Sequence, residues 1–122
     1  MSLYAIGDLH LSFTANKPMD VFGSEWKDHV RKIDRNWRGR IGAEDTVVIT
    51  GDHSWGRNLE EALADLDFIQ SLPGRKILLR GNHDMFWDAK KTYRLNEMFQ
   101  GRLSFLQNNY YACGAYALVG TK

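Results

Sequence analysis

Three short apolar runs, each followed by a glycine, constrain the fold of this chain more than any other feature. They are Leu3 to Ile6, Thr46 to Thr50 and Lys76 to Leu79, which are followed by Gly7, Gly51 and Arg80-Gly81. Short apolar or β-branched runs that stop at turn residues are typical of buried strands. The sequence therefore predicts three strands whose carboxyl ends open into polar segments.

Amphipathic helical patterns separate these predicted strands. Apolar residues recur at steps of three and four from Trp26 to Trp37 and from Leu59 to Ile69. Asn58 is predicted to be the N-cap of the second helix, with Glu60 and Glu61 in the first turn, where the helix dipole favours negative charge. The alternation of strands and helices predicts an α/β fold with right-handed βαβ units and a largely parallel sheet.

The remaining segments are less regular. Ser12 to Ser24 has no clear periodicity, and we expect a loop over the strand ends. Lys90 to Phe99 has a moderately helical pattern. Beyond Gly101 the sequence is typical of extended structure, and Gly114 is the predicted turn of a C-terminal hairpin.

Composition supports one packed domain and excludes several other classes of protein. The 122 residues are 43% hydrophobic and 12% aromatic, which is enough for a core. Sixteen basic and fifteen acidic residues leave a net charge of +1, so no bulk charge favours nucleic acid or an anionic membrane. The single cysteine excludes an internal disulfide framework, and no run approaches the roughly 18 apolar residues of a membrane span. Because the N-terminus has no signal-peptide pattern, we expect a cytoplasmic protein.

Side chains with metal-binding chemistry follow each predicted strand. Asp8 and His10 come after the first strand, Asp52 after the second and Asn82 after the third. Ligands bind at the carboxyl ends of parallel strands, and two residues that are two apart in an extended segment project to the same side. Nitrogen and oxygen donors together suit manganese, iron or zinc. We therefore expect two divalent metal ions at this edge, with Asp52 able to bridge them.

The chemistry that such a pair of ions serves best is hydrolysis of a phosphoester. Two cations about 3.5–4 Å apart can hold a phosphoryl oxygen and activate a water molecule. His83 lies beside a predicted ligand, so it is free to donate a proton to the leaving oxygen or to stabilise the transition state. Asp84 is predicted either to orient the His83 imidazole, as a second catalytic residue, or to cap the segment that starts near Met85.

Three motifs, "GDLH" (7–10), "GDHSW" (51–55) and "GNHD" (81–84), occur in this order, each behind an apolar strand. Together they resemble the first three motifs of the calcineurin-like metallophosphoesterases. The resemblance implies a calcineurin-like αββα sandwich that hydrolyses phosphomonoesters or phosphodiesters. It covers the front half of such a fold, so we expect residues 1–122 to be a single domain that is incomplete at its C-terminal end.

The resemblance also implies a role for each polar residue of the motifs. Asp8 and His10 would bind the first metal, and Asp52 would bridge the two metals. Asn82 would bind the second metal, and His83 would be the catalytic histidine.

Parts of the sequence depart from the family pattern. Trp55 stands where many members have an aspartate, although bacterial members with "GDxSW" share it, and His53 occupies a usually apolar position. His53 could orient a carboxylate, bind substrate or contact solvent. The family supplies further metal-binding histidines from later motifs, but no histidine follows His83 here. The alternative function is therefore a truncated, catalytically deficient metal-binding fragment that self-associates or pairs with a complementing chain. A nuclease of the same superfamily lacks the support of a basic aromatic stripe.

Structural interpretations stand beside the functional ones. Asp8 and Asp52 could cap turns, and Asn82 could occupy a left-handed turn position. Arg57 and Arg80 could reach a phosphate, but an arginine at a strand end is more often a solvated or paired surface residue.

The tryptophans divide by position. Trp26 and Trp37 fall at helical spacing and are expected in the core. Trp55 and Trp87 fall in loops near the predicted site and could line a pocket. His29 is expected on a helix face.

Overall fold

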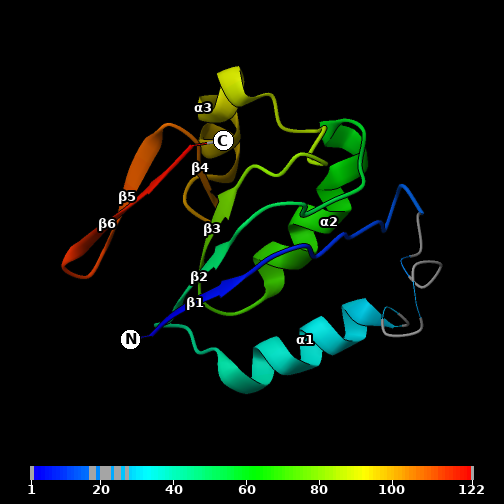
Figure 1. Cartoon of the computed structure of the whole chain (residues 1–122), viewed down its shortest axis with the longest axis horizontal. Helices are drawn as coiled ribbons and strands as arrows, with labels where there is room; N and C mark the ends of the chain where they lie inside the picture. Colours follow the sequence, from blue (N-terminus) through cyan, green and yellow to red (C-terminus); the bar gives the residue numbers. More distant parts are fainter. Residues whose placement is uncertain (1, 17–18, 20–22, 24–25, 27, 122) are drawn as a thin grey trace.

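The computed structural model describes residues 2–16, 19, 23, 26 and 28–121. The elements, in chain order, are β1 (Leu3–Ile6), α1 (His29–Arg40), β2 (Thr46–Ile49), α2 (Leu59–Ser71), β3 (Arg75–Leu79), the 3-10 helix η3 (Ala89–Lys91), α3 (Thr92–Phe99), β4 (Ser104–Leu106), β5 (Asn109–Cys113) and β6 (Tyr116–Gly120). The alternation of strands and helices, followed by the β5–β6 hairpin, confirms the predicted α/β class (Figure 1).

Among the described residues, β1, β2, β3 and β4 form one parallel sheet in that spatial order. The three strands predicted from sequence agree with β1, β2 and β3 to within one residue at each end. Ile6 pairs with Ile49, and Ile49 pairs with Leu78. Because these strands end side by side, the polar segments that follow them meet at one edge of the sheet.

The α-helices α1, α2 and α3 pack on one face of this sheet. Right-handed crossovers between strands that follow one another in spatial order place their helices on the same side. One buried apolar cluster joins the sheet to these helices, and it includes Val47, Ile49, Leu78, Trp37, Leu66, Ile69, Leu95 and Phe99. This cluster is the hydrophobic core that holds the helices against the sheet.

The β5–β6 hairpin covers the opposite face at β3 and β4. Gly120 of β6 lies so close to the sheet that an added Cβ would overlap the side chains of Leu79 and Leu106. The Arg75 guanidinium donates a hydrogen bond to the carbonyl of Ala112 in β5. At the other end of the sheet, Leu3 of β1 is 52% exposed, so the second face is covered at β3 and β4 and open at β1.

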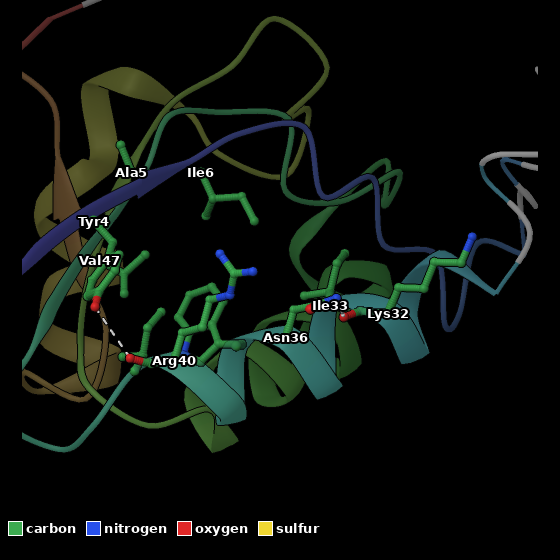
Figure 2. A pocket seen from close by; sticks show the side chains of 10 residues that line it. Tyr4, Ala5, Ile6, Lys32, Ile33, Asn36, Arg40 and Val47 are labelled. Carbon is green, nitrogen blue, oxygen red and sulfur yellow. Dashed lines mark hydrogen bonds between the residues drawn. The ribbon is translucent and has the colours of Figure 1, made fainter.

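A groove of about 440 Å³ runs between β1 and α1, on the face of the sheet that carries the helices (Figure 2). Tyr4 and Ile6 of β1 and Ile33, Asn36 and Arg40 of α1 are among its lining residues. The Tyr4 hydroxyl donates a hydrogen bond to the Arg40 carbonyl at 3.3 Å, which ties the strand to the end of the helix.

The starts of α2 and α1 differ in how well the local sequence predicts them. The Asn58 side chain accepts a hydrogen bond from the Glu61 N–H at 3.0 Å, which confirms Asn58 as the N-cap of α2. Helix α1 begins at His29, later than its apolar pattern, so Trp26 lies before the helix. Residues 13–15 form a turn within the predicted loop 12–24, most of whose later part lies outside the described residues. In the part of the chain that the structure describes, no helix is long and apolar enough to cross a membrane.

Candidate metal centre

Backbone hydrogen bonds continue the pairing of β1 and β2 past the ends of both strands. The His10 N–H donates to the Asp52 carbonyl at 2.9 Å, and the Leu11 N–H donates to the His53 carbonyl at 3.0 Å. The Trp55 N–H in turn donates to the Leu11 carbonyl at 2.8 Å. Because these bonds satisfy backbone groups of both segments, they fix the first two motifs against each other.

Asp8, His10 and Asp52 share a left-handed backbone conformation, with φ of 58°, 45° and 54°. This conformation is uncommon outside glycine, and residues held in it cluster at functional sites. The prediction of an extended segment at Asp8 and His10 is therefore wrong. The two side chains still meet, because the coiled segment brings His10 Nε2 to 3.8 Å from Asp8 Oδ1.

The donor atoms of these three residues are spaced like the ligands of one cation. His10 Nε2 lies 4.0 Å from Asp52 Oδ2, and the three donor atoms all lie within 4.8 Å of one another. A zinc ligand lies about 2.0–2.2 Å from its ion, so two ligands of one ion can be up to about 4 Å apart. The two pairs that include His10 meet this limit, so Asp8, His10 and Asp52 form a candidate donor set for a divalent metal ion.

The shifts in the pKa values of His10 and Asp52 favour the forms of both side chains that bind metal ions. Burial lowers the pKa of His10, although the Asp52 and Asp8 carboxylates act in the opposite direction. Burial by itself raises the pKa of Asp52, but hydrogen bonds from the His83 N–H and imidazole outweigh it and leave the pKa below its usual value. A neutral imidazole and an ionised carboxylate are the forms that bind metals.

His83 lies against Asp52 at the border of the donor set. Its backbone N–H donates to Asp52 Oδ1 at 2.9 Å, and its Nδ1 lies 3.1 Å from Asp52 Oδ2. The His83 side chain is 45% exposed, so a ligand can reach it from solvent. The structure thus brings His83 to the predicted place, and its catalytic role stays a prediction.

Asp84 is buried beneath the centre and ties the second and third motifs together. Its Oδ2 accepts hydrogen bonds from the N–H groups of Asp52 and Gly81, both at 2.8 Å. Its Oδ1 accepts from the N–H groups of His53 at 2.8 Å and Ser54 at 3.3 Å. The carboxylate that orients the His83 imidazole is therefore that of Asp52, and Asp84 holds the backbone around it.

Asn82 is exposed in the turn after β3, between Gly81 and His83. The hydrogen bond from the His83 N–H to Asp52 keeps this turn beside the donor set. The role of Asn82 as a ligand of a second ion stays a prediction.

His53 is fully buried, so contact with solvent, one of the three roles considered for it, is wrong. Its Nε2 lies 2.6 Å from the Leu79 carbonyl oxygen and 3.7 Å from Asp84 Oδ2. Its ring stacks on that of Trp87 at a centroid distance of 6.3 Å. Its Nε2 is engaged with the Leu79 carbonyl, so a role in orienting the nearby Asp84 carboxylate stays a prediction.

The free energy of unfolding is expected to fall as the pH drops from about 7 to about 5. Burial lowers the pKa values of His53 and His10 in the folded protein below 6.5. The unfolded chain therefore takes up protons that the folded chain does not, so this contribution is present above pH 6.5 and lost below it. Urea unfolding of the metal-free protein and of His53→Gln measures the effect. The variant should depend less steeply on pH, and equal slopes would show that His53 is not held neutral.

Gly81 allows a close backbone approach within the centre. An added Cβ would overlap the backbone nitrogen and Oδ1 of Asp52. Gly81→Ala is therefore expected to displace Asp52, to weaken Mn²⁺ binding and to lower the free energy of unfolding by about 1–3 kcal/mol. Calorimetric titration with Mn²⁺ measures the first effect. Gly39→Ala is the matched control, because a Cβ added there would meet no described residue within 4 Å other than its chain neighbours and the backbone of its own helix. Mn²⁺ affinity that is equal in both variants would contradict this account.

Two of the tryptophans, Trp26 and Trp87, do not lie where they are predicted. Trp37 is buried as predicted, but Trp26 is half-buried and lies edge-on to His10 at a centroid distance of 6.0 Å. The prediction for Trp26 is wrong because α1 begins after it. Trp87 is fully buried and packs edge-on against Phe105, so its predicted place on a pocket wall is also wrong.

Arg57 and Arg80 both contact protein groups. The Arg57 guanidinium pairs with Glu61 at 3.0 Å, and Arg80 Nε donates to the Trp87 carbonyl at 2.5 Å. The structural interpretation of both arginines is the better supported one.

Asp65 of α2 supports the segments around the candidate metal centre, a role that is not among the predictions from sequence. It is fully buried and accepts hydrogen bonds from the Ser54 hydroxyl at 2.5 Å and the Phe13 N–H at 2.9 Å. Burial raises the pKa of its carboxyl. Asp65 thereby connects the helix to the segments after β1 and β2. Its position on the apolar face of α2, between Ala62 and Leu66, is the signal that could have revealed it.

A parallel sheet whose strand ends gather an Asp-His-Asp donor set beside an exposed histidine defines an α/β protein with a candidate metal centre. The chain belongs to the calcineurin-like phosphoesterase family, whose sequence profile matches residues 1–120.

Known proteins similar to this chain include two from bacteriophages. The gene 66 protein of Mycobacterium phage D29 is 39% identical over 99 residues, which cover 77% of this chain and 48% of that protein. The gene 66 protein of Mycobacterium phage L5 is 34% identical over 77 residues, which cover 63% of this chain and 37% of that protein. The chain thus spans less than half the length of either phage relative.

A solved structure has the same fold. It is a protein of unknown function from Aquifex aeolicus, with a TM-score of 0.58 and 24% sequence identity. The similarity covers 96% of this chain and 58% of that one.

Proposed function

We propose that this protein hydrolyses a phosphomonoester or phosphodiester with two divalent metal ions, manganese, iron or zinc, at the candidate metal centre. The observation that carries the proposal is the Asp8, His10 and Asp52 donor set with His83 against Asp52. Membership of the calcineurin-like phosphoesterase family supports the same class of reaction.

The residues of the centre would bind the two ions in two groups that share Asp52. Asp8, His10 and Asp52 would hold one ion, and Asp52 and Asn82 would hold a second. Bound there, the ions would supply positive charge at a phosphoryl oxygen and make a water molecule more acidic. The centre faces solvent on the side of Asp8, whose side chain is 69% exposed.

His83 would donate a proton to the oxygen of the leaving group. Asp52 accepts a hydrogen bond from its Nδ1–H at 3.1 Å, so the Nε2–H of the imidazolium form is the group that would donate a proton to the leaving oxygen. The exposure of His83 allows substrates of different sizes to approach, so both monoesters and diesters are candidates.

Hydrolysis of an aryl phosphomonoester and of a bis-aryl phosphodiester, each with Mn²⁺ or with a chelator, tests this proposal. We expect turnover of at least one ester with Mn²⁺ and loss of it with the chelator. Asp52→Asn should abolish turnover, and Asp67→Asn, on an exposed position of α2, should leave it unchanged. Absence of turnover of both esters with Mn²⁺, Fe²⁺ and Zn²⁺ would contradict the proposal.

A second candidate is a catalytically deficient metal-binding protein that self-associates. The open side of β1 favours it, because an edge strand with exposed apolar side chains is suited to pairing with another chain. Leu3 is 52% exposed there, and Val119 of the hairpin is 76% exposed. Sedimentation velocity at several protein concentrations, with the ester assay on the same samples, separates the candidates. A dimer without turnover favours the second, and an active monomer excludes it.

A further inference from the structure

Trp55 lies in contact with both imidazoles of the metal centre, those of the buried His10 and the exposed His83. Its ring stacks on that of His10 at a centroid distance of 5.1 Å and an interplanar angle of 25°. It also lies 5.2 Å from the His83 ring at an angle of 48°. His10 and His83 are themselves 6.0 Å apart, so the three rings form one aromatic cluster. Separations of this size are typical of favourable aromatic contacts.

Trp55 is itself held at both its backbone and its ring. Its N–H donates to the carbonyl of the fully buried Leu11 at 2.8 Å. Its indole Nε1 donates to the sulfur of Met19 at 3.3 Å, and Met19 is also buried. The indole is therefore fixed in orientation before any ligand arrives.

His10 needs such a support because its own hydrogen bonding does not orient it. A histidine that binds a metal through one ring nitrogen is usually oriented by a hydrogen bond from the other nitrogen to a carboxylate or a carbonyl. His10 directs Nε2 toward Asp8 and Asp52, and its Nδ1 is buried without a hydrogen-bond partner among the described residues. Packing is left to set the plane of this imidazole, and of the two tryptophan rings near it Trp55 stacks on its face while Trp26 meets it edge-on.

His83 has a related need. The hydrogen-bond partner of the His83 ring is Asp52, a proposed metal ligand whose oxygens are shared between the two tasks. The Trp55 ring is a contact for His83 that does not compete with a metal ion.

We propose that Trp55 is a positioning residue whose indole sets the orientations of His10 for metal binding and of His83 beside it. This inference rests on the proposed function, because the metal-binding role of His10 comes from there. A flat aromatic ring at position 55 is what the arrangement requires, so phenylalanine should substitute for tryptophan and leucine should not.

Titration with Co²⁺, followed by visible absorption, tests the effect on the metal centre without an activity assay. Wild type and Trp55→Phe are expected to give similar spectra and affinities. Trp55→Leu should bind Co²⁺ at least about tenfold more weakly, in line with the tenfold or greater effects of residues that orient metal ligands. Equal affinity and an equal spectrum in Trp55→Leu would overturn the proposal. Failure of wild type to bind Co²⁺ would count against the proposed metal centre instead.

Histidine ring resonances in the metal-free protein test the positioning by a second route. Wild type and Trp55→Phe should each give one sharp set of signals for His10 and for His83. Trp55→Leu should give broadened or multiple sets, because the rings lose their common support. One sharp set for both histidines in Trp55→Leu would overturn the proposal, whatever the result with Co²⁺.

Phe13→Leu is the matched control for loss of an aromatic ring. Phe13 is 51% exposed, and its ring contacts Phe68 at 5.5 Å, away from the histidine cluster. It should retain the Co²⁺ affinity and the histidine signals of wild type. Circular dichroism establishes that each variant is folded before the comparison is made.

Discussion

Replacing Asp84 by asparagine is expected to lower the free energy of unfolding by about 3–5 kcal/mol. The fully buried carboxylate accepts hydrogen bonds from the N–H groups of Asp52, His53, Ser54 and Gly81. An asparagine has only one acceptor oxygen, and its NH₂ group would face N–H donors. Urea unfolding of the variant and of wild type measures the difference.

Asp88→Asn is the matched control for this experiment. Asp88 is exposed and accepts a hydrogen bond from the Lys90 N–H at 3.0 Å, at the start of η3. Since asparagine also serves as an N-cap, this change should alter the free energy of unfolding by less than about 1 kcal/mol. A change of the same small size in Asp84→Asn would show that the Asp84 carboxylate does not hold the second and third motifs together.

Replacing His83 by alanine is expected to lower turnover by about 10²–10⁴-fold, the usual contribution of general acid–base catalysis. Mn²⁺ affinity should change little, because His83 lies outside the Asp8, His10 and Asp52 donor set. Turnover at saturating Mn²⁺ and calorimetric titration with Mn²⁺ together separate the two effects.

Met85→Ala serves as the control for His83→Ala. Met85 is 64% exposed and lies two residues further along the same segment, so its loss should leave turnover and Mn²⁺ affinity unchanged. Unchanged turnover in His83→Ala would remove His83 from the mechanism. A loss of Mn²⁺ binding that matches the loss of turnover would make it a ligand instead.

Much of the fold could be predicted because local signals and tertiary packing agree. The runs from Leu3, Thr46 and Lys76 are apolar and stop at glycines, and the observed strands follow them closely. The N-cap at Asn58 is equally local. The start of α1 could not be predicted, because the apolar pattern includes Trp26, which packs against His10 of a distant segment.

The candidate site was predictable as a set of residues and less so as a set of contacts. Parallel strand ends bring Asp8, His10 and Asp52 together whatever the local backbone does, so the grouping was foreseen although the left-handed conformations were not. The orientation of buried groups depends on which backbone amides lie nearby. For that reason the sequence did not reveal that Asp84 holds N–H groups while Asp52 engages His83.

The metal content of the purified chain, measured by elemental analysis after loading with Mn²⁺ and removal of free metal, is the decisive measurement for the proposed two-metal site. Turnover of the two aryl esters is measured on the same sample. About two ions per chain together with turnover are expected, as a two-metal site requires. One ion or none, without turnover, would contradict it and leave a chain that keeps part of a phosphoesterase site without its chemistry.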